Sequence, residues 1–304
     1  MSEAVQNTKC GYAAVIGAPN AGKSTLINEM VGTKVSIVSP KVQTTRTRVL
    51  GIVMQDEAQI VLVDTPGIFE PDKRKTMERA MVAAALDGLS DADVILFLVD
   101  AHAYKRQDLS QILERLKAQN RPVALVLNKV DKINPEKLLE LSKELNDAHA
   151  FEVTFMVSAL KGKGVDDITS YLADVMPEGP HLFPEDQVSD MPVRLLAAEI
   201  TREKLFHKLH QELPYALTVE TEEWEPFQDG SIKINQTIYV ARDNHKGIVL
   251  GKGGSLIKDV GEKSRIELED ILETRVHLKL FVKVRENWMD DPERYAIWGL
   301  NTDS

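Results

Sequence analysis

The chain has 304 residues, a hydrophobic fraction of 43% and a formal net charge of −10 at pH 7. Its length exceeds the size at which one hydrophobic core usually stops growing, so we expect two domains, and its apolar content excludes a mainly disordered chain. The acidic balance weighs against nucleic-acid binding unless a local basic surface opposes it.

The N-terminus and the longest apolar run bear on where the protein works. The first ten residues are polar and lack the apolar core of a signal peptide, and the run at 94–99 is far too short to cross a bilayer. The single cysteine, Cys10, cannot form an intramolecular disulfide, which suits a reducing compartment. We therefore expect a soluble, cytoplasmic protein.

From Tyr12 to Tyr171, short apolar runs alternate with helical patterns. The runs are mostly β-branched, as in strands buried on both faces, and they lie at 13–16, 60–63, 94–99, 123–127 and 153–157. Apolar residues at three- and four-residue spacing predict helices between them, as at 109–116 and 138–145. This alternation predicts an α/β fold with a doubly wound, mostly parallel sheet, which binds ligands at the carboxyl ends of its strands.

A glycine-rich loop follows the first of these strands. It reads Gly17-Ala18-Pro19-Asn20-Ala21-Gly22-Lys23-Ser24 and precedes a helical stretch from Thr25, which is the context that a P-loop requires. The glycines let backbone N–H groups converge on phosphate oxygens, and the helix N-terminus adds positive potential. Lys23 is expected on the β- and γ-phosphates and Ser24 on Mg²⁺. The expected nucleotide-binding residues of the loop are Gly17, Asn20, Ala21, Gly22, Lys23, Ser24 and Thr25.

Two further segments are predicted to reach the γ-phosphate and its Mg²⁺. Asp64-Thr65-Pro66-Gly67 follows the strand at 60–63, where Asp64 can hold Mg²⁺ through water and the Gly67 N–H can meet the γ-phosphate. The polar loop at 39–48 can close over the nucleotide, and its Thr45 hydroxyl would complete a metal set of Ser24, Thr45 and Asp64, with Thr44 as the competing choice. The predicted catalytic residues are Lys23, Thr45 and Gly67.

A guanine site is predicted at the next strand ends. Asn128-Lys129-Val130-Asp131 follows the strand at 123–127, and the Asp131 carboxylate can accept hydrogen bonds from N1–H and the exocyclic amine of guanine, donors that adenine lacks there. Asn128 would brace the site, and the Lys129 stem would cover the base. Ser158-Ala159-Leu160 follows the strand at 153–157 and offers the Ala159 N–H to guanine O6. Phosphate, metal and base motifs in this order predict a Mg²⁺-dependent GTPase that binds GTP and GDP.

Two residues bear on the rate of hydrolysis. Ile68 stands where many GTPases carry a glutamine that orients the attacking water. An alkyl side chain cannot orient water by hydrogen bonding, so slow intrinsic turnover is expected. Asn20 either helps to hold a monovalent cation such as K⁺ against the phosphates or only shapes the loop, and the two alternatives are equally weighted.

The pattern changes near Met176, where prolines, glycine and polar residues crowd a linker. We place a GTP-binding domain at 1–178, a linker at 179–192 and a second domain with a C-terminal tail at 193–304. The second domain is predicted as α+β, with a helix, two strands, two helical segments and a last strand in succession. These elements are expected at about 193–212, 216–219, 232–240, around the glycines at 251–254, and at 277–284.

A G-x-x-G loop lies between the helical segments of the second domain. Gly251-Lys252-Gly253-Gly254 has apolar residues on both sides, and in this order of elements it favours a smaller type II KH domain, whose loop lets an RNA backbone approach closely. Six basic and three acidic side chains lie between Arg242 and Arg265, so the local charge is positive. The predicted RNA contacts are Lys246, Gly251, Lys252, Gly253, Gly254 and Lys258.

Over nearly the whole chain, these motifs resemble the Era family of bacterial GTPases. The GTPase motifs are shared with many relatives, and the more specific groups are Arg202-Glu203-Lys204, Glu212-Leu213-Pro214-Tyr215 and Gly251-Lys252-Gly253-Gly254. The resemblance implies binding near the 3′ end of 16S, small-subunit ribosomal RNA and help in maturation of the 30S subunit. It also implies RNA binding favoured by GTP, hydrolysis stimulated by RNA, and peripheral contact with the inner membrane; we further expect a monomer. The chain departs from the usual family pattern at Ala18 and Thr47.

Two functions remain open at this point. In the first, GTP and Mg²⁺ order the loop of Thr45 and thereby control RNA binding by the second domain. In the second, the protein is a constitutive RNA-binding assembly factor that uses GTP only structurally, which the missing glutamine favours. Relatives that modify tRNA or carry two GTPase domains are disfavoured, because they need a C-terminal cysteine or a repeated P-loop, respectively.

Overall fold

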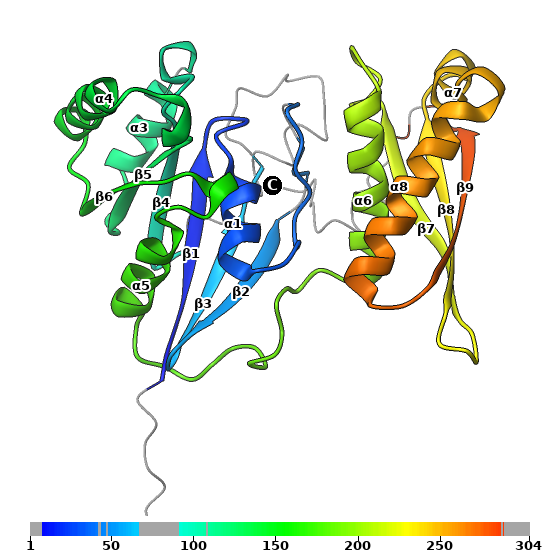
Figure 1. The fold of residues 1–304 in the computed structure, drawn as a ribbon. Coiled ribbons are helices and arrows are strands. Elements are labelled where there is room, and N and C mark those ends of the chain that lie inside the picture. Colours follow the sequence, from blue (N-terminus) through cyan, green and yellow to red (C-terminus); the bar gives the residue numbers. More distant parts are fainter. Residues whose placement is uncertain are drawn as a thin grey trace, which may run out of the picture.

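The computed structural model describes residues 8–41, 44–46, 48–66, 91–107, 109–286 and 288. They form a six-stranded sheet with helices on both faces, followed by a three-stranded sheet with helices on one side (Figure 1). Among the helices of this part of the chain, none is both long and apolar enough to cross a membrane.

The first sheet has the strand order β2-β3-β1-β4-β5-β6. All of its strand pairs are parallel except β2 with β3, so the predicted doubly wound, mostly parallel sheet is confirmed. The strands are β1 (Lys9–Gly17), β2 (Val49–Gln55), β3 (Ala58–Asp64), β4 (Val94–Asp100), β5 (Val123–Asn128) and β6 (Val153–Met156). The carboxyl ends of the parallel strands lie at one edge of the sheet, which is where the predicted site residues follow them.

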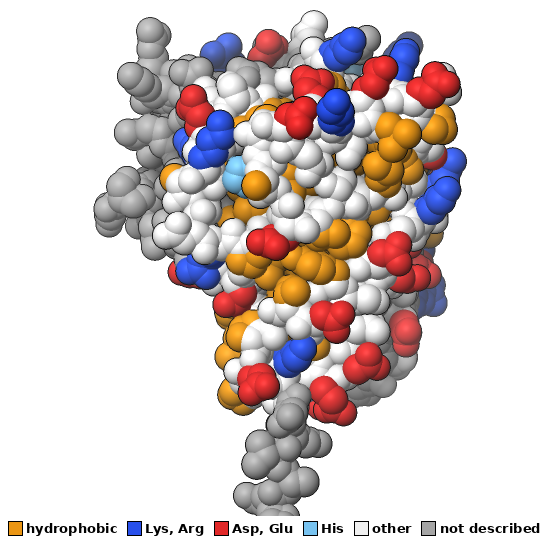
Figure 2. Space-filling model, turned by 90° about the vertical axis from the view of Figure 1, so that its left-hand side faces the viewer, with side chains coloured by type: hydrophobic (Ala, Val, Ile, Leu, Met, Phe, Trp, Pro, Cys, Tyr) orange, Lys and Arg blue, Asp and Glu red, His pale blue; other side chains and the backbone are white. Residues whose placement is uncertain are grey.

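Two strands differ from the sequence prediction. β2 was not predicted, although its apolar run is joined to β3 by a tight turn in which Asp56 has a φ of 50°. The prediction that 153–157 is buried on both faces is wrong, because β6 lies at the edge of the sheet and is only half-buried. This edge is turned to the viewer in Figure 2, where apolar side chains gather among acidic and basic ones.

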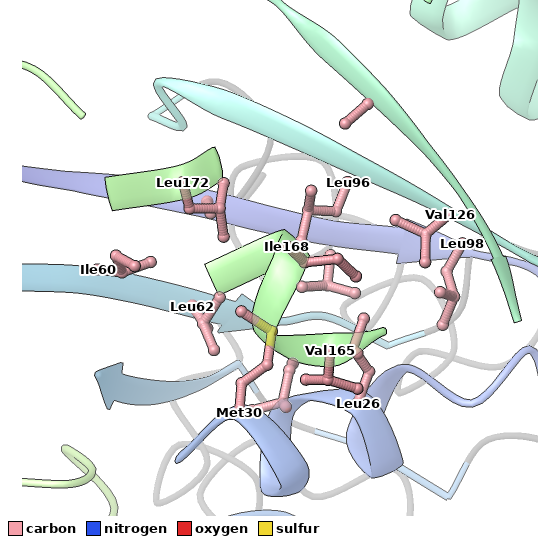
Figure 3. Close-up of a cluster of buried hydrophobic side chains, with 14 of the residues drawn as sticks. Leu26, Met30, Ile60, Leu62, Leu96, Leu98, Val126, Val165, Ile168 and Leu172 are labelled. Atoms are coloured by element: carbon pink, nitrogen blue, oxygen red, sulfur yellow. The ribbon is translucent and has the colours of Figure 1, made fainter. Parts of the chain in front are cut away.

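Helices cover both faces of this sheet. Helices α1 (Lys23–Val31) and α5 (Val165–Val175) pack on one face, where Leu26, Ile168 and Leu172 meet side chains of β3, β4 and β5 (Figure 3). Helices α3 (Ser110–Lys117) and α4 (Pro135–Ala148) pack on the other face. Short 3-10 turns at Tyr104–Arg106, Val130–Lys132 and Ala159–Lys161 lie at the edge of the sheet where the site forms.

The second domain has the predicted order of elements. It consists of α6 (Val193–Lys208), β7 (Leu217–Pro226), β8 (Ile232–Val240), α7 (Asp243–Leu250), a 3-10 turn (Lys252–Gly254), α8 (Ser255–Leu272) and β9 (Val276–Val284). β8 pairs with β7 antiparallel and with β9 parallel. α6 and α8 pack on the side of the sheet that faces the first domain (Figure 1).

Helix α6 ends four residues before its predicted limit. Leu209 is extended and buried in the core of the second domain, and Gln211 has a positive φ of 56°, so the helix cannot continue.

The segment between the two domains lies against the first sheet. Ser189 Oγ donates to Leu50 O at 2.7 Å, and the Leu50 N–H donates to Asp190 Oδ1 at 2.9 Å. Gln59 Nε2 donates to Phe183 O at 2.8 Å, and Phe183 packs beside β3. The domain limits of 1–178 and 193–304 stay a prediction, but the segment joining them is attached to the first sheet over much of its length.

Candidate nucleotide-binding site

The motifs predicted for phosphate, metal and base surround one cavity of about 370 Å³. It lies at the carboxyl edge of the first sheet, where β1, β3 and β5 end. Its lining comes from the P-loop, the loop after α1, the turn after β5, the turn after β6 and His207 of α6, and includes Lys23, Thr45, Asp131 and Leu160. Motifs that are far apart in sequence therefore meet at a single place.

Two glycines are required by close packing in the P-loop. A Cβ atom at Gly17 would lie 2.3 Å from Leu98 O, and one at Gly22 would lie 2.4 Å from Asn128 Nδ2. Gly22 also has a φ of 103°, which side chains other than hydrogen disfavour. These constraints hold the loop against β4 and β5, so that its backbone N–H groups can turn to the cavity.

Lys23 lies inside the loop. Its Nζ donates to Gly17 O at 3.2 Å and to Ala18 O at 3.3 Å, and its side chain is buried. Burial lowers the pKa of Lys23 to about 8, although the Asp64 carboxylate acts in the opposite direction. An anionic phosphate beside this ammonium would favour its charged form.

Three oxygen-bearing side chains converge where a metal is expected. Ser24 Oγ donates to Asp64 Oδ2 at 2.8 Å, and Thr45 Oγ1 lies 3.0 Å from Ser24 Oγ and 3.4 Å from Asp64 Oδ2. Asp64 is fully buried, and its Oδ1 has no hydrogen-bond partner in the described part of the chain. Burial raises the pKa of Asp64, against hydrogen bonds from Ser36, Ser24 and Thr45 and the charge of Lys23. An orphaned carboxylate oxygen beside two hydroxyls is a donor set that fits Mg²⁺.

Of the two candidate threonines, Thr45 has its hydroxyl at this point. Thr44 Oγ1 instead donates to Lys41 O at 2.8 Å and lies 2.6 Å from Ser39 Oγ. The geometry therefore favours Thr45 over Thr44, and the role of Thr45 toward the metal stays a prediction. Ser36, whose Oγ donates to Asp64 Oδ2 at 2.6 Å, was missed, because a lone serine in a loop gives no sequence signal.

The base-site residues form a connected network. Asn128 Nδ2 donates to Ala21 O at 2.8 Å, and Asn128 Oδ1 accepts from Ala159 N at 3.0 Å, so Asn128 joins the P-loop to the turn after β6. The Ala159 N–H, expected on guanine O6, thus points to Asn128. Ser158 Oγ donates to Asp131 Oδ1 at 2.8 Å, and Lys161 Nζ lies 3.2 Å from Asp131 Oδ2. The hydrogen bond from Ser158 is the main cause that lowers the pKa of Asp131, with Lys161 assisting, so this carboxylate is ionised at neutral pH.

Lys129 spans the cavity between the P-loop and β4. Its Nζ donates to Asn20 O at 2.7 Å and to Asp100 Oδ2 at 2.6 Å. Its backbone φ of 63° places the side chain across the end of the sheet. Asp100 was not predicted as part of the site. Its position at the end of a strand, opposite Asn128 in the next strand, is the feature that could have indicated it.

The remaining predicted residues fall into two groups. Asn20 Nδ2 donates to Pro40 O at 2.9 Å, which is a loop-shaping contact, and its role toward K⁺ stays a prediction. Thr25 lines the cavity at the start of α1, and Leu160 lines it with a 75% exposed side chain. Gly67, Ile68 and Thr47 lie outside the described residues.

The G-x-x-G loop lies at the far end of the second domain. A Cβ atom at Gly251 would lie 2.7 Å from Leu256 Cβ, whereas one at Gly253 would meet nothing within 4 Å. Gly251, Gly253 and Gly254 have φ angles of 73°, 59° and 78°. Lys252, Gly253 and Lys258 are exposed, Lys246 is half-buried, and Ile248 beside them is 53% exposed. The loop thus presents an open backbone, cations and an apolar surface together.

Comparisons with known proteins agree with this arrangement. The sequence matches the family described as 50S ribosome-binding GTPase over residues 12–129 and the KH domain family over residues 212–289. It is 58% identical over 293 residues to GTPase Era of Mesorhizobium japonicum, covering 96% of this chain and 94% of that protein. It is 55% identical over 300 residues to GTPase Era of Brucella suis, covering 99% and 96%.

Two solved structures have the same fold over almost their whole length. One is a crystal structure of Era in complex with MgGDPNP and nucleotides 1506–1542 of 16S ribosomal RNA, with a TM-score of 0.91 and 43% identity over 96% of this chain and 99% of that one. The other is an Era variant from Aquifex aeolicus bound to GDP and AlF4⁻, with a TM-score of 0.90 and 42% identity over 96% and 99%.

Proposed function

Because the chain belongs to the Era family of GTPases, we propose that it is a GTP-hydrolysing switch that binds the 3′ end of 16S ribosomal RNA during assembly of the 30S subunit. The observation that carries the proposal is the convergence of the phosphate, metal and base motifs on one cavity, with the ionised Asp131 at one end and Lys23 at the other. A carboxylate that accepts two hydrogen bonds selects guanine over adenine.

The motif residues of the cavity have distinct roles in this proposal. The P-loop backbone from Gly17 to Thr25 and the Lys23 ammonium would bind the β- and γ-phosphates. Ser24, Thr45 and Asp64 would hold Mg²⁺, which when bound neutralises charge on the phosphate oxygens. The Thr45 hydroxyl would thereby help to keep the γ-phosphate in position for attack by water.

The base end of the cavity would hold guanine between Lys129 and the turn after β6. Asp131 would accept from N1–H and the exocyclic amine, while Asn128 keeps the turn against the P-loop through its bonds to Ala21 and Ala159. Gly67 would contribute its N–H to the γ-phosphate, as the sequence predicts. With an alkyl Ile68 beside it, turnover of the protein alone is expected to be slow and RNA to accelerate it.

The second domain would bind the RNA. Its open Gly253 backbone lets a sugar–phosphate chain approach, and Lys252 and Lys258 supply charge for the phosphates. The related Era structure that contains nucleotides 1506–1542 of 16S ribosomal RNA supports this choice of partner. A monomeric state, a cytoplasmic location, peripheral contact with the inner membrane and the use of K⁺ are further proposals that follow from the family.

Calorimetry and single-turnover kinetics test the proposal. We expect GDP and GTP to bind with Mg²⁺, ATP to bind at least about 100-fold more weakly, and hydrolysis to accelerate when an RNA of nucleotides 1506–1542 is added. Equal affinity for guanine and adenine nucleotides would refute the switch. Tight GTP binding without turnover, with or without this RNA, would instead favour the constitutive assembly factor.

A further inference from the structure

The loop that carries Thr45 packs against the second domain. The Val38 N–H donates to Glu203 Oε1 at 2.8 Å, and Lys41 Nζ donates to Phe206 O at 2.5 Å. Glu203 and Phe206 belong to α6, and the loop runs along the side of the first domain that faces this helix (Figure 1). The metal site and the second domain are therefore joined by one short segment of chain.

The side chain of Arg46 is buried against the second domain. Its side chain is only 2% exposed, its Nη1 donates to Leu217 O at 2.9 Å, and its Nη2 donates to Tyr215 O at 3.2 Å. Its Cζ lies 5.8 Å from the ring centroid of Phe206 and 5.8 Å from that of Trp288. A guanidinium between two aromatic rings, with carbonyl acceptors at its edge, is a specific and desolvated contact.

A second contact with the second domain holds the residue that precedes Thr45. Arg202 of α6 is fully buried, and its Nη2 donates to Thr44 O at 2.6 Å. Arg202 is fixed in turn by Glu199, whose Oε1 accepts from its Nε at 2.7 Å. The residues before and after Thr45 are thus both bound to the second domain, while the Thr45 hydroxyl lies 3.0 Å from Ser24 Oγ.

Two of the three sequence groups that distinguish this chain from other GTPases meet where the loop of Thr45 contacts the second domain. Arg202-Glu203-Lys204 contributes the bonds to Thr44 and Val38, and Glu212-Leu213-Pro214-Tyr215 contributes carbonyls to Arg46. Neither group lines the nucleotide cavity or the G-x-x-G loop. Their common position beside Arg46 gives them a role that neither site explains.

We infer that Arg46 is a positioning residue through which the second domain holds Thr45 at the metal site. The inference rests on the proposed function, since it concerns the metal that the triphosphate brings. Binding of the triphosphate with Mg²⁺ and docking of the second domain then stabilise each other, because a coupling between two sites is reciprocal. GDP has no γ-phosphate for Thr45 to enclose and gains little from the docking.

The docked arrangement leaves the RNA loop accessible. Lys252 and Gly253 are exposed in it, and a Cβ atom at Gly253 would meet nothing within 4 Å. RNA can therefore bind the same arrangement that holds Thr45 at the metal. The triphosphate and RNA can therefore occupy the same arrangement of the two domains, in which Arg46 is part of the contact between them.

Nucleotide affinities of Arg46 variants test the inference. The probes are fluorescent GDP and a fluorescent β,γ-imido analogue of GTP, both with Mg²⁺. Arg46→Ala should lower the affinity for the analogue roughly 10-fold and change the affinity for GDP less than twofold. Arg46→Lys keeps the charge without the planar fork and should restore part of the loss. Arg194→Ala, at an exposed position of α6, is the matched control and should change neither affinity.

A double-mutant cycle assigns the effect to the junction. Phe206→Leu removes one of the two rings around Arg46, so it should weaken the analogue in the same way, and Arg46→Ala in its presence should add little. Thermal unfolding of each variant shows whether it is folded, and Arg46→Lys carries the test if Arg46→Ala does not fold. RNA of nucleotides 1506–1542 should bind wild type more tightly with the analogue than with GDP, and Arg46→Ala should make the two affinities converge.

The outcomes separate the inference from the proposed function. If folded Arg46→Ala and Phe206→Leu proteins discriminate the analogue from GDP as wild type does, the inference is wrong and the guanine site stands. If both nucleotides weaken equally, Arg46 supports the fold rather than Thr45, and the inference is again wrong. A wild-type protein that binds no guanine nucleotide refutes the proposed function itself.

Discussion

Asp131 is held in its charged form before any base reaches it. Ser158 Oγ donates to one carboxylate oxygen and Lys161 lies beside the other, and together they lower the pKa of the group. A carboxylate fixed in this way cannot turn to suit a different base. In the proposed guanine site, base specificity would therefore depend on one preorganised acceptor.

The first prediction concerns this acceptor. In Asp131→Asn, the amide oxygen can still accept from N1–H, but the amide NH₂ faces the exocyclic amine of guanine, so donor meets donor and GTP affinity should fall by about 3 kcal/mol, or roughly 100-fold. Xanthine carries a carbonyl where guanine has its amine, so xanthosine triphosphate should bind more tightly to the variant than to wild type. Calorimetry measures both affinities. Asp147→Asn, an exposed site on α4, should leave both unchanged, and equal GTP affinity in Asp131→Asn would remove Asp131 from the base site.

At the residue scale, the sequence predicted the members of the site whose chemistry is carried by a motif. Lys23, Ser24, Asp64 and Asp131 each follow a strand in a recognisable group, and they line or border the observed cavity. Ser36 and Lys161 were not predicted, because the hydrogen bond of one and the ion pair of the other do not belong to any sequence motif. Motifs thus predict which residues are candidates for contact with the ligand, but not the residues that hold those candidates in place.

At the scale of elements, α6 shows why a helix can carry buried charge. Its residues Glu199, Arg202 and Glu203 are all buried, since one side packs on the sheet of its own domain and another meets the loop of the first domain. The sequence predicted the helix from its composition and order. Its second contact surface could not be predicted, because charged residues on a helix face are usually solvated.

The second prediction concerns Glu203. Burial alone would raise its pKa, but Lys34, Lys204 and the Val38 N–H outweigh burial, so the pKa lies below its ordinary value of 4.5. A carboxylate with a lowered pKa stabilises the fold above its unfolded pKa, and this contribution is lost as the pH falls through the folded pKa. Glu203→Gln should therefore be less stable than wild type by about 1 kcal/mol or more at pH 7. The difference should shrink below pH 4.5.

Denaturant unfolding at pH 7, 5 and 3.5 measures this difference. Glu262→Gln on α8 is the control, because Glu262 is exposed, and its stability should follow wild type at each pH. A difference between Glu203→Gln and wild type that stays constant from pH 7 to 3.5 would show that the ion pairs with Lys34 and Lys204 do not set the stability of the junction.

At the scale of the whole molecule, the two-domain plan was predictable but the contact between the domains was not. Arg46 and Leu217, whose side chain and carbonyl meet, are 171 residues apart. Periodicity and motifs describe neighbours in sequence, and nothing in either domain's pattern specifies where the other domain lies. The family-specific groups at 202–204 and 212–215 were recognised from the sequence, but only the structure shows that both contact the loop of Thr45.

At the same scale, the charge near the G-x-x-G loop differs in sign from the net charge of the chain. The chain has a net charge of −10, yet the segment from Arg242 to Arg265, which contains the G-x-x-G loop, has six basic and three acidic side chains. Salt screens charges beyond about 10 Å at 0.1 M, so an RNA phosphate at this loop responds to the local cations rather than to the total. RNA binding should therefore weaken with salt despite the acidic chain.

The third prediction measures how many phosphates the loop neutralises. With about three of its lysines on phosphates, a plot of log affinity against log salt should have a slope near −2 for a single strand. Lys252→Ala should make the slope shallower by about 0.7, because one counterion fewer is released, and should leave GTP affinity unchanged. Lys117→Ala, at an exposed position of α3, should keep the wild-type slope. Lys252 is exposed beside the open Gly253 backbone, so an unchanged slope in its absence would place the RNA on another surface of the second domain.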